Sequence, residues 1–149
     1  MMNISLFRYA FVLMLLALLG AFFLPAMAVP RLGLSAHTIG MLSGVLLLAL
    51  GAIWQQFSLT DSQRNWMKWS WIYSSYANWL GCLVGAVFGA GRMTPIAAAG
   101  VEGAAVTEMT VTLLLGSVAI TSLLAVGLSL WGLRSSAHSS AEPSLRFSS

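Results

Sequence analysis

Charged residues are scarce in this chain of 149 residues: only 7% are Asp, Glu, Lys or Arg, whereas 58% are hydrophobic. A soluble domain usually carries about 25% charged residues, because its surface must stay in contact with water. The mean hydropathy of +0.86 points the same way. The composition therefore excludes a water-soluble enzyme and a disordered chain, and it predicts an integral membrane protein.

Cysteines and basic clusters are lacking too. Cys82 is the only cysteine, which excludes an intramolecular disulfide and a cysteine-based zinc site. The seven Lys and Arg residues contribute to a net charge of +3, but they are scattered between apolar runs and form no stripe that could follow phosphates. We therefore expect no nucleic-acid partner. The sequence also offers no catalytic triad, phosphate-binding loop or pair of intramembrane carboxylates.

What the chain does contain is four long segments without charge. Each is long enough for the roughly 20 residues with which a helix crosses the hydrocarbon layer, and a backbone in lipid must satisfy its own hydrogen bonds. We expect one all-α domain, 1–134, built as a bundle of four transmembrane helices near 6–29, 34–56, 69–91 and 109–133. The serine-rich segment 135–149 is predicted to be a disordered cytoplasmic tail.

The first segment also has a rival interpretation. Arg8, the apolar run that follows it and the string Ala26-Met27-Ala28 are together typical of a signal peptide with its cleavage site. We favour a retained helix, because the apolar run is longer than that of a typical signal peptide.

The distribution of basic and aromatic residues predicts the orientation. Four spans place both termini and the loop 55–68 on one side, which holds Arg8, Arg64, Lys68, Arg134 and Arg146 against Arg31 and Arg92 on the other. Positively charged loops stay in the cytoplasm, so we expect both termini there. The same ends of the spans carry tryptophans, which prefer the headgroup level: Trp54, Trp66, Trp69, Trp71 and Trp131.

Polar side chains inside an apolar span carry a burial cost and therefore mark functional candidates. His37 is the only histidine in the expected spans. Helical spacing places Gly40, Met41 and Gly44 on its face, where small residues would let a flat group or another helix approach closely. Two interpretations stay open: a histidine bonded to a carbonyl or to water, and a ligand of a metal or of haem iron.

The third expected span is the most polar. Ser74, Asn78 and Cys82 follow one another at i, i+4 and i+8 and share a face, and Asn78 lies near the middle of the span. An unpaired amide is expensive there. A hydrogen bond to a neighbouring helix and a role in a pocket are both open. For Tyr76, packing with a satisfied hydroxyl is the simplest role.

The loop 91–108 is dominated by alanine and glycine, and its low polarity predicts that it folds back over the bundle as a cap. It contains Glu102 and Glu108. Acid–base chemistry is one interpretation of these carboxylates; we expect instead that both are solvated.

Three strings carry a resemblance to a known family: Pro30-Arg31-Leu32-Gly33-Leu34-Ser35-Ala36-His37, then Tyr76-Ala77-Asn78-Trp79-Leu80, then Gly89-Ala90-Gly91 followed by Met93-Thr94-Pro95-Ile96-Ala97-Ala98. From about Val29 to Arg134 the chain resembles the bacterial hydroxylaminobenzene mutases, which are small four-span membrane proteins. It is more distantly similar to styrene oxide isomerase, a membrane protein that uses ferric haem b as a Lewis acid.

The mutase resemblance implies an isomerase of the bacterial inner membrane that acts in nitroaromatic degradation. It would move the hydroxyl of an aryl hydroxylamine from nitrogen to the ortho ring carbon, giving a 2-aminophenol, and a dry pocket would return the oxygen to the ring before water enters. The distant likeness implies a haem b whose iron, held by His37, acts on the hydroxylamine oxygen, with Asn78 in the pocket. Tyr76 and Ser43 are further candidates; Ser43 stands where these families are expected to have asparagine.

Alternative functions and the assembly follow from the same residues. Ser74 and Cys82 stand where the epoxide isomerase has an acidic residue and a tyrosine, which makes epoxide chemistry less favoured. A related epoxide isomerase and a haem-binding or electron-transfer subunit remain alternatives. We expect a homo-oligomer, because four short helices enclose little volume and a haem would sit more easily between protomers. The distant likeness implies a trimer.

Overall fold

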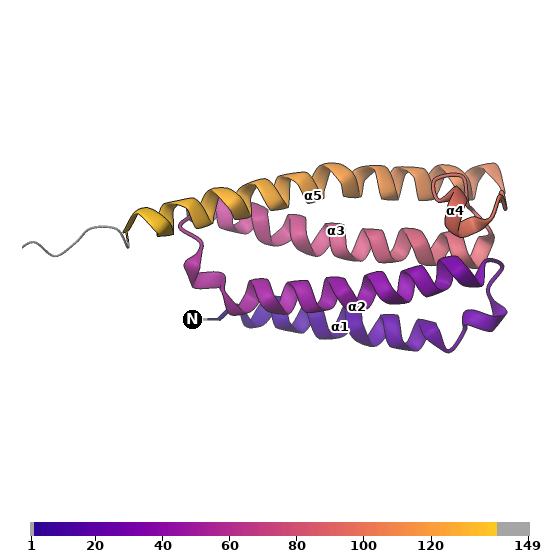
Figure 1. Ribbon diagram of the computed structural model, residues 1–149, viewed down its shortest axis with the longest axis horizontal. Helices are drawn as coiled ribbons and strands as arrows, with labels where there is room; N and C mark the ends of the chain where they lie inside the picture. The colour runs from indigo at the N-terminus through magenta and orange to yellow at the C-terminus, as the bar shows by residue number, and fades with distance from the viewer. Residues whose placement is uncertain (1, 140–149) are drawn as a thin grey trace, which may run out of the picture.

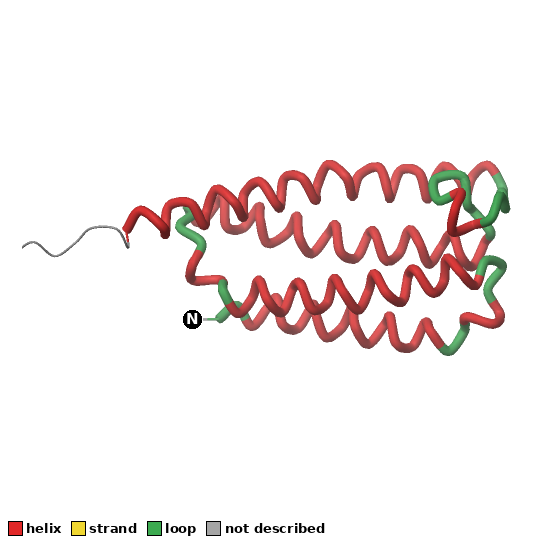
Figure 2. Tube along the Cα trace, in the orientation of Figure 1, coloured by secondary structure: helices red, strands yellow, loops and turns green. Residues whose placement is uncertain are grey.

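The computed structural model describes residues 2–139, with side chains as far as Arg134, and this part of the chain is helical without strands. Four long helices lie antiparallel to their neighbours in the chain (Figure 1). Short helical turns and loops connect them at the two ends (Figure 2). The long helices are α1 (Ile4–Ala21), α2 (Pro30–Ala52), α3 (Asp61–Phe88) and α5 (Ala105–Ser139); the short ones are η1 (Leu24–Ala26), η2 (Trp54–Gln56) and α4 (Pro95–Ala98).

Prolines shorten the first helix and begin the second. The Asn3 side chain accepts a hydrogen bond from the Leu6 N–H and caps α1. The helix ends at Ala21 rather than at 29, and the chain turns through η1, which contains Pro25. Pro30 is the first residue of α2, where its missing N–H costs nothing. The predicted spans 6–29 and 34–56 were therefore wrong at the connection between α1 and α2. Hydropathy alone does not show that these prolines end one helix and begin the next.

The third helix begins well before its apolar stretch. Thr60 and Gln63 form a capping box, in which each side chain bonds the backbone N–H of the other at 3.4 and 3.1 Å. Asp61 in the first turn suits the positive end of the helix dipole. The helix therefore starts at Asp61. The charge pattern had predicted a start at 69, which was wrong. The helix ends at Phe88, and its C-cap residue Gly89 has a φ of 71°, a conformation that favours glycine.

The last long helix extends past both predicted limits. It begins at Ala105 rather than at 109 and continues to Ser139, into the segment predicted as a disordered tail. Residues 140–149, the remainder of that tail, lie outside the described residues.

Three helices are long and apolar enough to cross a membrane by length and composition: α1, α2 and the part of α5 from Ala105 to Arg134. These helices make the chain a membrane-type protein, as its composition predicts. The polar α3 is not among them, which leaves the predicted fourth span without that support.

The long helices pack in chain order, with α1 on α2, α2 on α3, and α3 on α5, and α5 contacts chiefly α3. Two apolar clusters fill the interfaces. One lies toward the chain termini and is built from Leu6, Ala10, Leu13, Leu47, Leu50, Trp54, Phe57, Met67 and Ile72. The other lies at the opposite end and is built from Val29, Leu32, Ala36, Cys82, Ala86 and Ala98; we call it the outer cluster.

Candidate functional site

His37 lies on α2 and points its ring toward α1. The ring atom Nδ1 is 2.9 Å from the carbonyl oxygen of Ala17, and the side chain is half-buried. Because a carbonyl only accepts, Nδ1 donates in this bond, and in the tautomer with one ring proton Nε2 has a lone pair. The structure thus shows the carbonyl bond of the first interpretation. It leaves the second open, since histidines that bind metals commonly donate their other N–H to a carbonyl.

The space beside the two glycines on the His37 face is filled by neighbouring helices. A Cβ atom at Gly40 would lie 2.5 Å from the Cβ of Ala17 and 2.9 Å from Cδ1 of Trp79, and one at Gly44 would collide with Met14. Of the two uses that small residues allow here, the structure assigns both glycines to helix packing. Met41 is half-buried on the same helix.

Asn78 and Ser43 are half-buried and keep their polar groups available. Within the described part of the chain, neither side chain hydrogen bonds to another residue. The hydrogen bond from Asn78 to a neighbouring helix, which was one of its two open roles, is therefore absent among the residues that the structure describes. No hydrogen bond joins Asn78 to His37 among the described residues either, since the His37 ring bonds α1.

Tyr76 has a hydroxyl that is already used. It donates to the carbonyl oxygen of Tyr9 at 2.7 Å, and the two rings meet edge to face with centroids 6.3 Å apart. The simplest role predicted for Tyr76, packing with a satisfied hydroxyl, is what the structure shows. The residue joins α3 to α1.

Sequence reasoning missed two contributors to this region, Ala17 and Trp79. Ala17 acts through its backbone oxygen, so no side chain signals it. Trp79 lies against the turn of α2 that contains Gly40 and packs on both apolar clusters. Its place directly after Asn78 in a polar span was the available signal.

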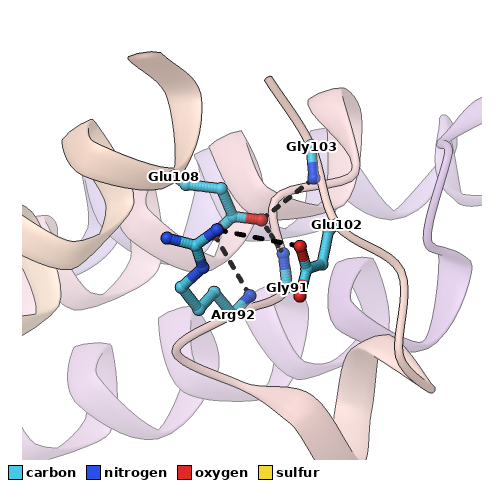
Figure 3. A network of polar contacts seen from close by, with 5 residues as sticks. All are labelled: Gly91, Arg92, Glu102, Gly103 and Glu108. Carbon is cyan, nitrogen blue, oxygen red and sulfur yellow. Dashed lines mark hydrogen bonds and ion pairs between the residues drawn. The ribbon is translucent and has the colours of Figure 1, made fainter. Parts of the chain in front are cut away.

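Glu108 is the most buried charged side chain among the described residues, with 2% of its surface exposed. Its Oε1 accepts hydrogen bonds from the backbone N–H groups of Gly91 and Gly103, each at 3.0 Å, and Oε2 accepts one from Arg92 at 3.1 Å (Figure 3). The expectation of a solvated carboxylate was wrong here, because α5 begins early enough to bring Glu108 under the loop. Glu102 is exposed and lies 3.7 Å from Arg92, a surface pair of small energetic weight.

The loop from Gly89 to Ala104, which includes α4, forms the predicted cap at the outer end. Ala98 of α4 is 1% exposed and belongs to the outer cluster together with Ala36 and Cys82. The cap therefore covers the contact between α2 and α3 at Ala36, which directly precedes His37 in the sequence.

The donor set limits what this region can hold. Within the described residues, no three His, Cys, Asp or Glu side chains gather at one point. A metal bound mainly by protein side chains does not fit these residues. A group that needs a single imidazole from this chain, such as a haem iron, fits His37.

Comparison with known proteins gives three matches. A family model described as styrene oxide isomerase matches residues 2–134. Hydroxylaminobenzene mutase HabB of Ectopseudomonas oleovorans is 48% identical over 124 residues, which cover 83% of this chain and 76% of that protein. Hydroxylaminobenzene mutase HabA of the same organism is 38% identical over 117 residues, or 78% and 87% of the two chains. No solved structure matches the chain.

Proposed function

The chain belongs to the styrene oxide isomerase family and is an isomerase, and from that membership we propose that it converts aryl hydroxylamines of the hydroxylaminobenzene type into 2-aminophenols. The similarity to two hydroxylaminobenzene mutases over most of each chain carries the proposal. The hydroxyl moves from nitrogen to the ortho carbon of the same molecule while a ring proton moves to nitrogen. No reductant or nucleotide is consumed.

The proposal includes a haem b held by His37. The hydrogen bond from Nδ1 to the Ala17 carbonyl leaves Nε2 as the ligand atom and fixes the plane of the ring. When bound, an iron with one protein ligand would supply a Lewis acid for the hydroxylamine oxygen. His37 is the only histidine of the sequence within the predicted spans, and a single imidazole ligand favours substrate binding over electron transfer.

The other candidate residues divide between orientation and packing. The free amide of Asn78 and the hydroxyl of Ser43 are assigned to hydrogen bonds with the hydroxylamine group. Tyr76 is assigned to holding α3 on α1, since its hydroxyl bonds Tyr9. Gly40 and Gly44 hold α1 against α2 and thereby keep the Ala17 carbonyl beside His37, while Met41 stays a candidate contact of the cofactor.

We further propose that α3 crosses the membrane as the fourth span. It packs on α2 and α5, and two of its polar side chains bond side chains of α5: Tyr73 bonds Ser117 and Trp71 bonds Ser129. Polar groups paired in this way are tolerated in lipid. The excess of basic residues at the end with the termini supports cytoplasmic termini in a bacterial inner membrane.

A homo-oligomer, of three copies as the resemblance implies, is supported by the outer face of α5. Large apolar side chains are exposed there, including Met109, Leu113, Ile120, Leu123 and Leu130. Gly116 and Gly127 belong to the same helix, and a Cβ atom added at either glycine would meet no neighbouring atom within 4 Å. Such small residues permit a helix of another copy to approach closely.

One assay tests the function. Protein purified in detergent should form 2-aminophenol from hydroxylaminobenzene without added cofactor. A second candidate, epoxide isomerisation, is favoured by the description of the family model, so styrene oxide is the parallel substrate. Conversion of styrene oxide alone would overturn the mutase proposal and support the second candidate.

The haem is tested separately by absorption. The purified protein should show a Soret band that shifts when an aryl hydroxylamine is added, and His37→Ala should lose the band. A colourless active preparation would overturn the haem assignment and leave the mutase proposal standing.

A further inference from the structure

Both ends of the outer loop converge on one carboxylate. Gly91 and Arg92 lie near the beginning of the loop and Gly103 near its end, and all three donate backbone N–H groups to Glu108 (Figure 3). Burying a carboxylate is costly unless it is hydrogen bonded, and here three donors replace water. Glu108 belongs to α5, so these bonds fasten the closed loop to a long helix.

The backbone is tightly packed at the two glycines that contact Glu108. A Cβ atom at Gly91 would collide with the Ala98 side chain and the Val101 carbonyl, and one at Gly103 would lie 3.0 Å from the Phe88 carbonyl oxygen. Backbone therefore packs on backbone around Glu108. The arrangement depends on the loop adopting this one conformation.

On the opposite side the loop rests on α2 without comparable polar bonds among the described residues. A surface pocket of about 300 Å³ lies between the two and is lined by Arg31, Leu34, Ser35, Ile96 and Ala97. The loop is thus fastened to α5 and rests by apolar contact over the outer cluster, which contains Cys82. This is the geometry of a lid held by a latch.

We propose that Glu108 is a positioning residue that latches the loop 89–104 as a lid and keeps water out of the interior beside His37. The inference rests on the proposed function for its consequence. When the N–O bond of the substrate breaks, the same oxygen must form the new C–O bond. Water that entered would form that bond instead, and the original oxygen would leave as water.

The lone cysteine provides a readout that needs neither substrate nor cofactor. In Glu108→Gln, one oxygen remains for Gly91 and Gly103, but an NH2 group faces the N–H of Arg92. The loss of a hydrogen bond to a carboxylate should raise the equilibrium constant for opening of the loop about tenfold. We expect a small water-soluble thiol reagent to label Cys82 about tenfold faster than in the unaltered chain.

The matched control is Glu102→Gln, which removes a carboxylate of the same loop that is exposed and paired only with Arg92. Its labelling rate should stay at the unaltered value. Equal rates in Glu108→Gln and the unaltered chain, with helical content retained, would overturn the latch. If Glu108→Gln does not fold, Gly103→Ala displaces the loop and leaves Glu108 in place; it should also accelerate labelling, and an unchanged rate would again overturn the proposal.

An isotope experiment connects the latch to the reaction. In water enriched in oxygen-18, the unaltered protein should form 2-aminophenol without the label, and Glu108→Gln should form a labelled fraction. An active Glu108→Gln whose product carries no label contradicts the water-excluding role. An unaltered protein that forms no 2-aminophenol contradicts the proposed function, and the labelling of Cys82 then still decides whether Glu108 is a latch.

Discussion

At the scale of single residues, the position of His37 is set by its neighbours on α1. The carbonyl that orients its ring belongs to Ala17, and the Cβ of the same residue touches the turn of α2 at Gly40. The histidine therefore keeps its orientation only while the two helices stay in close contact. This dependence can be tested without altering the histidine.

We predict that Gly40→Ala lowers stability and disturbs His37. The added Cβ meets Ala17 and Trp79, and overpacking of this kind costs about 1–3 kcal/mol. Thermal unfolding in detergent should show a lower midpoint, and any Soret band should shift. The control is Gly20→Ala, where the new Cβ has no atom within 4 Å; an equal loss in both variants would contradict the packing argument.

Tyr76→Phe should destabilise the chain more than Tyr73→Phe. The Tyr76 hydroxyl is half-buried and bonds the Tyr9 carbonyl, whereas that of Tyr73 is on an exposed residue and bonds Ser117, which has a second partner in Leu114. We expect a loss of about 1 kcal/mol for Tyr76→Phe and a smaller one for Tyr73→Phe. If Tyr76→Phe unfolds at the same midpoint as the unaltered chain, the Tyr76 hydrogen bond contributes nothing to stability.

Glu108 shows which residue roles a sequence leaves undetermined. His37, Asn78 and Tyr76 could be named as candidates because polar residues are rare inside apolar segments. The burial of Glu108 depends on where α5 begins and on a loop conformation that only Gly91 and Gly103 permit. Neither can be deduced from an alanine- and glycine-rich segment, so its carboxylate could only be expected to lie in solvent.

At the scale of elements, helix ends follow capping chemistry rather than hydropathy. The charge-free stretches located all four long helices, three of which are long and apolar enough to cross a membrane. They misplaced the ends, since Pro25 stops the first helical segment early and the Thr60–Gln63 box starts α3 in a charged region. Charge marks where a helix leaves an apolar layer, and the hydrogen bonds decide where it stops.

Thr60→Ala should destabilise α3 by about 1 kcal/mol, because the Gln63 N–H loses its acceptor at the first turn. Circular dichroism during thermal unfolding measures the effect. Thr38→Ala serves as the control: the Thr38 hydroxyl only bonds the Leu34 carbonyl within α2 and is exposed, so little change is expected. A loss as large in Thr38→Ala would argue against a capping effect.

At the scale of the whole molecule, the helices form an open series in which α5 has a partner on one side only. Both positions face open space, so Gly116→Leu and Gly127→Leu should leave the fold of one chain intact. The proposed association between copies through this face should be weakened. Native mass spectrometry should show a shift toward monomers. Gly20→Leu places the same side chain at an open position of α1, and a similar shift there would show that the α5 face is not the interface.

The pairing of α3 with α5 has a consequence for how the chain enters a membrane. Two polar groups of α3 find partners on α5, in the bonds from Trp71 to Ser129 and between Tyr73 and Ser117. During synthesis α3 emerges first, before those partners exist. The fourth span proposed for α3 would therefore pass into the lipid together with α5 as a hairpin, whereas α1 and α2 are long and apolar enough to cross a membrane on their own.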